Sequence, residues 1–256
     1  MLAVTRKNQI KDIIQEKKSV SVSELALKFS VTEETIRRDL KFLEDEGFLT
    51  RTYGGAFIQD GVENEVDLDI RETVYEDSKK AIAKKALELI HNGDTIYLDT
   101  STTAYYIAKA IWDMNLTVLT NSLLIVDFLS KFENIRIICI GGQFSHKSKS
   151  FIGRSTQKVL GYYFVDKTFM SCRSLSMEHG ITDSNEETAI IRQNLLDRSN
   201  KIYIIADYSK FDKTSFVNIC DFNAIHGIIT DNNLSEEWVS FLKENNVEIY
   251  MCSTDK

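Results

Sequence analysis

Residues 32–40 read T-E-E-T-I-R-R-D-L and place two adjacent arginines, Arg37 and Arg38, on one predicted helix. At 3.6 residues per turn, Ile36, Leu40 and Leu43 fall on a single face, so the arginines point away from it. Guanidinium groups hydrogen-bond to guanine edges and to phosphates of duplex DNA. Two adjacent arginines on an exposed helix face thus have the chemistry for contact with DNA, and the elements around them decide whether they serve it. The glutamates before the arginines have a simpler explanation, because acids suit the positive end of a helix.

A second group of polar residues follows a predicted buried strand. The sequence D-T-S-T-T at 99–103 ends the strand 95–99 and opens a helix. Free backbone N–H groups, the helix dipole and up to four hydroxyls can hold a phosphate there. The alternative is that the hydroxyl residues are simple helix caps. Asn121, Gly141 and Lys210 follow other predicted strands, where a cap, a turn and a solvated lysine are the alternatives to ligand binding.

The bulk composition places these groups in an ordinary globular chain. The 256 residues carry a net charge of -7, and 43% of them are hydrophobic. No apolar run approaches the roughly 20 residues that span a bilayer, and the N-terminus lacks a signal-peptide pattern, so we expect a cytoplasmic protein. Neither the four cysteines nor the four histidines show metal-ligand spacing. We expect free thiols, no metal and no cofactor.

Charge divides the chain. Residues 1–57 carry 10 basic and 9 acidic residues, whereas 59–78 carry eight acids and one base. Such a polar, acidic run is typical of a linker or a solvated loop. We therefore predict a small N-terminal unit at 1–58, a linker at 59–78 and a large unit at 79–256.

The small unit reads as a winged helix-turn-helix. A first helix is predicted from about Thr5 to Lys17, a second opens with the capping pattern S-V-S-E at 21–24, and a third begins at Thr32 and ends at Gly47. Residues 48–58 alternate around two glycines and predict a hairpin with Arg51 near its tip. The alternative is a generic three-helix bundle.

The large unit alternates short apolar strands with helices. Strands are predicted at 95–99, 117–120, 135–140, 165–172, 201–207, 226–230 and 248–252, and helices at 79–91, 104–114, 122–132, 155–163, 186–199 and 235–245. Near-continuous apolar strands indicate a mainly parallel sheet covered on both faces. Ligands of such sheets collect at the carboxyl ends of the strands.

Residues 19–56 resemble the DNA-binding domain of DeoR-family transcriptional regulators, through T-I-R-R-D-L and the wing string R-x-x-G-G-A. Tyr53 departs from the histidine that is common in the family. The resemblance implies a helix-turn-helix at about 20–39 that binds operator DNA. The residues that it implies at the DNA are Thr32, Glu34, Thr35, Arg37, Arg38, Lys41, Arg51, Tyr53 and Gly54.

The large unit resembles DeoR sensor domains, because D-x-x-T-T, T-N, G-G, F-I-G, G-I-T-D, Glu187 and D-x-S-K-F occur in the family's order. Those domains are similar to ribose-5-phosphate isomerases and bind phosphorylated sugars. The resemblance thus implies an α/β sensor with effector contacts at Asp99, Thr100, Ser101, Thr102, Thr103, Asn121, Gly141, Arg173, Glu187 and Lys210.

Two positions depart from the family pattern. Ser101 stands where glycine is usual, and Arg173 stands where a small or acidic residue is usual. Arg173 either clamps a second anionic group or pairs with Glu178.

The expected function is a ligand-responsive transcriptional regulator, most simply a repressor of a sugar-metabolism operon that binds repeated half-sites as a homodimer or homotetramer. The alternative is a sugar-phosphate isomerase that carries a DNA-binding domain, with Glu187 and Lys210 as catalytic groups. The acidic pair that isomerases carry after the fourth strand is replaced by Cys172-Arg173-Ser174, so we expect no enzyme.

Overall fold

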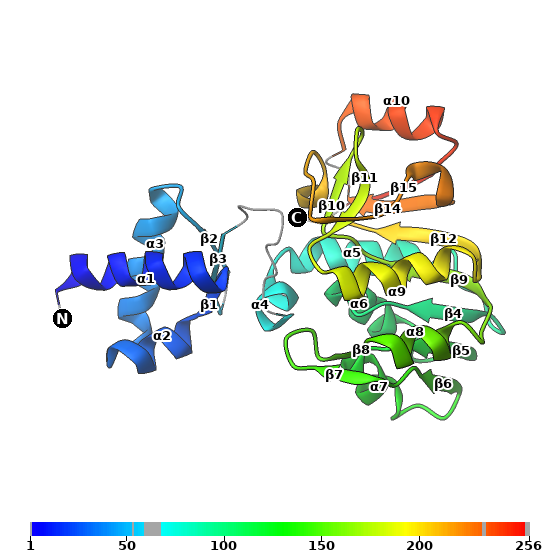
Figure 1. The fold of residues 1–256 in the computed structure, drawn as a ribbon, viewed down its shortest axis with the longest axis horizontal. Coiled ribbons are helices and arrows are strands. Elements are labelled where there is room, and N and C mark those ends of the chain that lie inside the picture. Colours follow the sequence, from blue (N-terminus) through cyan, green and yellow to red (C-terminus); the bar gives the residue numbers. More distant parts are fainter. Residues whose placement is uncertain (1, 53, 59–67, 232–233, 254–256) are drawn as a thin grey trace. The chain divides into compact units, whose positions relative to one another are not determined.

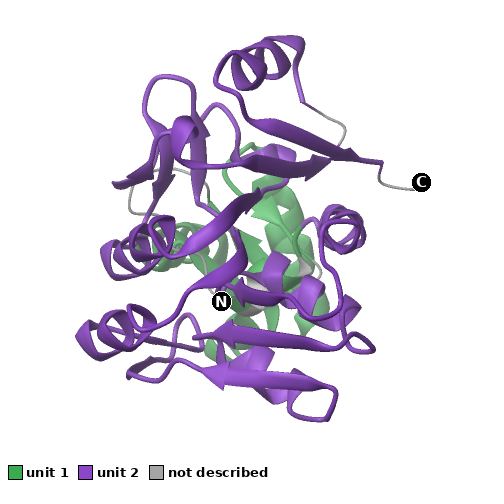
Figure 2. Ribbon diagram, turned by 90° about the vertical axis from the view of Figure 1, so that its right-hand side faces the viewer, with its two compact units in different colours: residues 1–74 green, residues 75–256 purple. Residues whose placement is uncertain are grey.

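The computed structural model describes residues 2–52, 54–58, 68–231 and 234–253. The chain divides into two compact units, residues 1–74 and residues 75–256 (Figure 2). Each unit has its own hydrophobic core.

The N-terminal unit is the predicted winged helix-turn-helix (Figure 1). Its helices α2 and α3 form the helix-turn-helix, and β2 and β3 form the wing. The elements are α1 Ala3–Lys17, β1 Ser19–Ser21, α2 Val22–Phe29, α3 Glu33–Asp45, β2 Thr50–Arg51, β3 Gly55–Phe57 and α4 Leu68–Thr73.

Local sequence explains where the helices begin and end. The Ser21 hydroxyl accepts a hydrogen bond from the Glu24 backbone N–H at 3.1 Å, and the Thr32 hydroxyl accepts one from the Thr35 N–H at 3.3 Å. The cap predicted at Ser21 is confirmed, and Thr32, the predicted start of the third helix, also acts as a cap. The Glu24 side chain pairs with Lys17 on α1. Gly47 adopts φ +73° just after α3, the left-handed conformation that favours glycine at a helix end.

The wing contains one strand more than predicted. The hairpin β2–β3 is confirmed, but β1 pairs antiparallel with β3 and completes a three-stranded sheet in the order β1-β3-β2. This third strand explains Gly55, because a Cβ at that position would lie 2.1 Å from the Val20 carbonyl oxygen of β1. The close approach of the two backbones requires glycine there.

The acidic segment predicted as a linker is partly helical. Helix α4 begins at Leu68 and lies against β1 and β3 of the N-terminal unit. Leu68 is buried, and Val74 packs against Phe57. Helix α5 then begins at Glu76, three residues before the predicted start. The earlier part of the segment, 59–67, lies outside the described residues.

The large unit is built on a seven-stranded sheet, which confirms the predicted α/β fold. All of its strands are parallel, in the order β15-β14-β12-β9-β4-β5-β6. The strands are β4 Thr95–Leu98, β5 Leu116–Thr120, β6 Ile135–Cys139, β9 Val165–Met170, β12 Ser199–Ile205, β14 Gly227–Asp231 and β15 Glu248–Cys252.

Helices cover both faces of this sheet (Figure 1). On one face lie α5 Glu76–Leu87, α6 Thr102–Ala110 and α7 Leu123–Leu129, which bury residues such as Ile82 and Ile107 against Ile96 and Leu98 of β4. The other face carries α8 Arg154–Leu160, α9 Glu186–Leu196 and α10 Glu236–Glu244. Alternate residues of β4 thus enter different cores, as expected for a sheet buried on both sides.

Smaller elements were not predicted. A three-stranded antiparallel sheet, order β10-β11-β13, comprises β10 Ser174–Ser176, β11 Gly180–Asp183 and β13 Val217–Cys220. A hairpin joins β7 Gln143–Ser145 to β8 Ser150–Ile152, and the 3-10 helices are η1 Tyr208–Lys210 and η2 Phe222–Ala224.

In the part of the chain that the structure describes, every helix is too short or too polar to cross a membrane.

Candidate DNA-binding face and effector site

Helix α3 presents the residues predicted to contact DNA on the side opposite its buried stripe. Ile36, Leu40 and Leu43 are buried, as their spacing predicts. The structure leaves Thr32, Glu34, Arg37, Arg38 and Lys41 exposed and Thr35 partly buried.

Glutamates of α3 hold two of the predicted arginines. The Glu33 carboxylate lies 2.6 Å from Nη2 of Arg37. The Glu44 carboxylate lies 2.7 Å from Nε of Arg51, on strand β2. The Arg38 side chain, by contrast, makes no hydrogen bond or ion pair with any described residue, so its guanidinium N–H donors are left for solvent or a partner. Tyr53, the remaining predicted wing side chain, lies outside the described residues, and Gly54 beside it is exposed.

A buried ion pair that sequence reasoning missed fixes α3 on α1. The Arg6 Nε lies 2.6 Å from Oδ2 of Asp39, with 8% of each side chain exposed. Asp39 is three residues after Ile36 and four before Leu43, and so belongs to the buried stripe. A charged residue on an otherwise apolar stripe is the signal that predicts such a partner. The pair orients the helix that carries Arg38.

Some of the predicted effector residues, those of the turn at 99–103, follow β4 at the switch point of the main sheet, where the order of the strands reverses. From β4 the chain continues outward through β5 and β6, and then returns to β9 on the other side of β4. The carboxyl ends of β4 and β9 are therefore neighbours, and a crevice at such a point is where ligands of open α/β sheets bind. Asp99 follows β4, and Ser171 follows β9.

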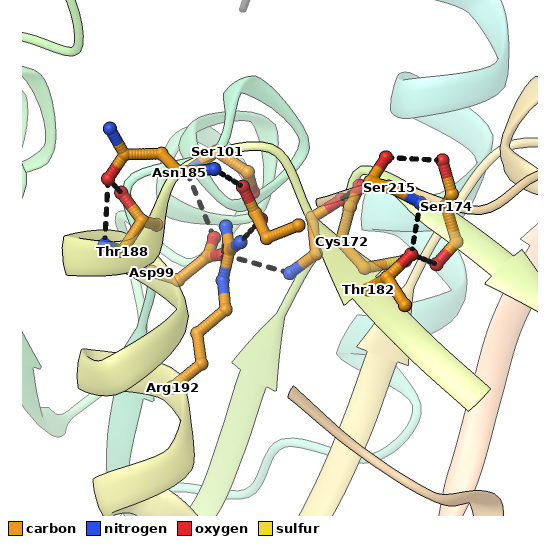
Figure 3. A network of polar contacts seen from close by, with 11 residues as sticks. Asp99, Ser101, Cys172, Ser174, Thr182, Asn185, Thr188, Arg192 and Ser215 are labelled. Atoms are coloured by element: carbon orange, nitrogen blue, oxygen red, sulfur yellow. Dashed lines mark hydrogen bonds and ion pairs between the residues drawn. The ribbon is translucent and has the colours of Figure 1, made fainter. Parts of the chain in front are cut away.

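A buried arginine from α9 occupies this switch point (Figure 3). Nη2 and Nε of Arg192 lie 2.7 and 3.1 Å from Oδ2 of Asp99, and Nη1 bonds to Asp183 at the end of β11. The two carboxylates and the Arg192 side chain are all buried. Burial disfavours the charge on Arg192, but the two carboxylates outweigh it and raise the pKa of the guanidinium. Arg192 thus joins the main sheet to the small sheet.

Sequence reasoning missed Arg192 as well. On α9 it lies three residues after Ala189 and three before Leu195, both of which are buried. As with Asp39, the signal was a charge on an apolar stripe.

Hydrogen bonds from neighbouring groups hold the turn at 99–103 in place. Oδ1 of Asp99 accepts the Ser101 N–H at 2.9 Å, and Oδ2 accepts the Ser171 N–H at 2.9 Å. The Ser101 hydroxyl caps α6 by accepting the Ala104 N–H at 3.1 Å. Thr102 and Thr103 are buried in the first turn of α6, and Thr100 is half-buried. The Asp99 carboxylate thus accepts hydrogen bonds from two backbone N–H groups and from Arg192, and it supports the turn.

Asn121 and Gly141 are engaged by neighbouring strands and helices. The Asn121 amide oxygen accepts the Tyr97 hydroxyl at 2.6 Å, and its nitrogen donates to the Phe151 carbonyl at 2.7 Å. Gly141 is exposed after β6, and its carbonyl accepts the Thr156 hydroxyl at 3.1 Å. Gly141 is separated from the switch point by strand β5.

Charges of both signs surround Cys172 on the small-sheet side of the switch point. Burial raises the pKa of the Cys172 thiol to about 12, Lys210 and Arg192 act in the opposite direction, and Asp183 and Asp207 raise the pKa further. Arg173 follows directly, and its N–H donates to the Thr182 carbonyl at 3.0 Å. Burial and the charge of Arg173 lower the pKa of Lys213.

Glu187 lies apart from these contacts. It is exposed in the first turn of α9, next to Thr188, whose N–H donates to the Asn185 cap at 3.0 Å.

Comparisons with known proteins agree with this architecture. Residues 6–61 match the DeoR-like helix-turn-helix domain, and residues 75–232 match the DeoR C-terminal sensor domain. The HTH-type transcriptional regulator YulB of Bacillus subtilis is 41% identical, with 97% of this chain and 96% of that protein covered.

Two further relatives have names that refer to sugars. The L-fucose operon activator of Haemophilus influenzae is 31% identical over 91% of this chain and 94% of its own length. The lactose phosphotransferase system repressor of Staphylococcus epidermidis is 31% identical over 96% of both chains.

A solved ribose 5-phosphate isomerase from Methanocaldococcus jannaschii is 17% identical, with a TM-score of 0.40 and coverage of 53% of this chain and 54% of that one. So distant a likeness says nothing about activity.

These three relatives, which cover 91–97% of this chain, are transcriptional regulators, so the isomerase alternative falls away. With both family domains in order along its length, this chain belongs to the DeoR family of helix-turn-helix transcriptional regulators.

Proposed function

We propose that this regulator represses an operon for sugar metabolism and that a phosphorylated sugar, bound at the β4–β9 switch point, alters its hold on DNA. Relatives named for fucose and lactose operons support the sugar-metabolism part. One of them is an activator and the other a repressor, so the direction of control needs its own test.

One observation carries the effector proposal: the threonine-rich turn at 99–103 opens α6 at the switch point and is braced from below by Asp99 and Arg192. The N-terminus of α6 supplies N–H groups and the positive end of the helix dipole. Thr100 and Thr103 contribute hydroxyls, and Lys210 and Arg173 supply positive charge toward the small sheet. A sugar phosphate matches this combination of anion site and polar surroundings.

For DNA, we assign α3 to the major groove and the wing to the adjacent backbone. Arg38 is the base-reading candidate, because its donors are free of contacts with the described residues. Arg37 and Arg51, each held by a glutamate, are phosphate contacts.

A thermal-shift measurement on the full chain tests the effector proposal. Pentose and hexose phosphates are compared with the unphosphorylated sugars and with inorganic phosphate. A ligand in large excess over its Kd raises the melting temperature by about 5 °C or more. K210Q should reduce that shift, whereas K201Q, at an exposed lysine on β12, should keep it. Equal shifts for K210Q and the parent would remove Lys210 from the site.

A gel-shift titration tests the DNA assignment. Arg38→Ala should cost about 1–3 kcal/mol of binding to DNA from upstream of the operon that the protein controls. R136A, at an exposed arginine of the sensor unit, is the matched control. Unchanged affinity of R38A at fixed salt would refute the assignment.

Because repeated half-sites need paired DNA-binding units, light scattering of the free protein should give the mass of a dimer or a tetramer.

A further inference from the structure

We propose that Glu44, an acidic residue of α3, is a positioning residue for DNA binding, because it holds the wing arginine Arg51 in the orientation that meets a phosphate. The proposal rests on the DNA-binding face described above. It has an unusual consequence: removal of this negative charge should weaken binding to a polyanion.

Both carboxylate oxygens of Glu44 are used for the wing. Oε2 accepts the Arg51 Nε–H at 2.7 Å, and Oε1 accepts the Arg51 backbone N–H at 2.9 Å. One side chain therefore fixes two things at once, the place of strand β2 against α3 and the direction of the Arg51 side chain. Strand β2 has only two residues, and this tether adds to its antiparallel pairing with β3.

The rest of the Arg51 guanidinium is left for a ligand. Nη1 and Nη2 make no hydrogen bond with the residues that the structure describes, and Arg51 lines a groove of about 280 Å³ between α3 and the wing. Arg37 lines the same groove, held by Glu33. Planar guanidinium groups with fixed N–H donors are the preferred partners of phosphate oxygens.

Positioning outweighs repulsion at this place for two reasons. Glu44 and Arg51 are each about one third exposed, at 34% and 35%, so water and salt screen the carboxylate from a phosphate beyond the arginine. A free arginine side chain, in contrast, loses most of its rotamer freedom when it binds, and a prearranged one does not. Glu44 also holds the backbone that leads into the wing turn, where the Thr52 hydroxyl accepts the Gly55 N–H at 3.0 Å.

The charge on Glu44 persists at neutral pH. Burial opposes its ionisation, but the hydrogen bonds from the Arg51 side chain and backbone, aided by the charge of Lys41, lower the pKa of the carboxyl.

The test compares E44Q with D45N in the full chain. Asp45 is the next residue on α3 and is exposed, and its side chain makes no hydrogen bond or ion pair within the described ranges, so D45N removes the same charge without disturbing an arginine. The probe is a short mixed-sequence duplex at low ionic strength, because phosphate contacts act on any sequence. Fluorescence anisotropy should give a Kd about fivefold higher for E44Q, while D45N binds as tightly as the parent or more tightly. An E44Q protein that matches or exceeds the parent in affinity would overturn the proposal.

A double-mutant cycle separates positioning from a general loss of structure. R51Q should weaken binding and lower the slope of log K against log salt by about 0.9. If Glu44 acts through Arg51, E44Q/R51Q should bind no more weakly than R51Q alone. An equal further loss in the R51Q background would mean that Glu44 acts through the fold, and the positioning role would be wrong.

R37Q, at the other arginine assigned to a phosphate, is measured beside these variants and keeps the two proposals apart. If neither R37Q nor R51Q weakens binding to the mixed-sequence duplex, the DNA-binding face itself is wrong. Weaker binding by both, with E44Q unchanged, would reject only the role of Glu44.

Discussion

The Arg192 guanidinium lies on the Asp99 carboxylate, with Nη2 and Nε 2.7 and 3.1 Å from the same oxygen, Oδ2. Both side chains are buried, and the same guanidinium reaches Asp183 of the small sheet. A buried charge that loses its partner is costly, because water cannot replace the lost contact.

R192Q should therefore lower the free energy of unfolding of the sensor unit by about 3 kcal/mol or more, since two carboxylates would stay buried without their cation. Denaturant unfolding followed by tryptophan fluorescence measures it, because both tryptophans, Trp112 and Trp238, lie in that unit. R192K should be intermediate. R154Q, at an exposed arginine of α8, should stay close to the parent, and a similarly small effect of R192Q would contradict the pairing.

The two wing glycines should respond differently to alanine. G55A brings a Cβ to 2.1 Å from the Val20 carbonyl oxygen and must push β1 away from β3, whereas a Cβ on Gly54 meets nothing within 4 Å. Amide hydrogen exchange of residues 19–58 should be much faster in G55A and nearly unchanged in G54A. Equal protection in both variants would show that the wing does not need the close β1–β3 approach.

The cysteines should differ in reactivity. Burial raises the pKa of Cys172 and of Cys220 to about 12, and that of Cys252 to about 11. Since the thiolate is the reactive form, these thiols should be inert at pH 7 and their reactivity should rise only at strongly alkaline pH. Cys139 is exposed and should react first with iodoacetamide. Peptide mapping after brief alkylation identifies the modified residue, and C139S should abolish the fast phase.

Glu44 should make wing stability depend on pH. A carboxyl whose pKa is lower in the folded protein stabilises the fold above its ordinary value, here 4.5, and loses that contribution as the pH falls through the folded-state pKa. E44Q should therefore be less protected than the parent at pH 7, and the difference should shrink below about pH 4. Hydrogen exchange of residues 48–58, corrected for the intrinsic rate at each pH, measures this. A difference that grows with acidity would contradict the lowered pKa.

Much of the fold follows from local patterns. The strands of the main sheet are apolar runs between helices, and Ser21 and Thr32 mark helix starts by hydroxyl capping. Strand β1 carries no such signal, because its three residues are extended only through pairing with β3, far along the chain. The strands of the small sheet β10-β11-β13 likewise carry no local signal, because β11 pairs with β13, far along the chain. Short strands that depend on long-range partners have no periodicity of their own to read.

Of the candidate effector site, the sequence predicts only the parts that local patterns mark. The turn at 99–103 can be found in the sequence because helix-opening hydroxyls are a local pattern. Arg192 is 93 residues away from Asp99, and only the fold brings the two together. Asp99 and Asn121 were predicted to contact the effector, whereas in the structure protein groups hydrogen-bond to both, so their part in binding stays a prediction.

The end of the N-terminal unit matters to anyone who builds chimeric regulators. Helix α4 lies against strands β1 and β3, and Val74 packs on Phe57. A fusion junction at residue 58, where the helix-turn-helix pattern stops, would therefore remove α4 and Val74 and expose Phe57 of the transplanted domain. Exchanges between family members should instead carry the donor sequence through Val74.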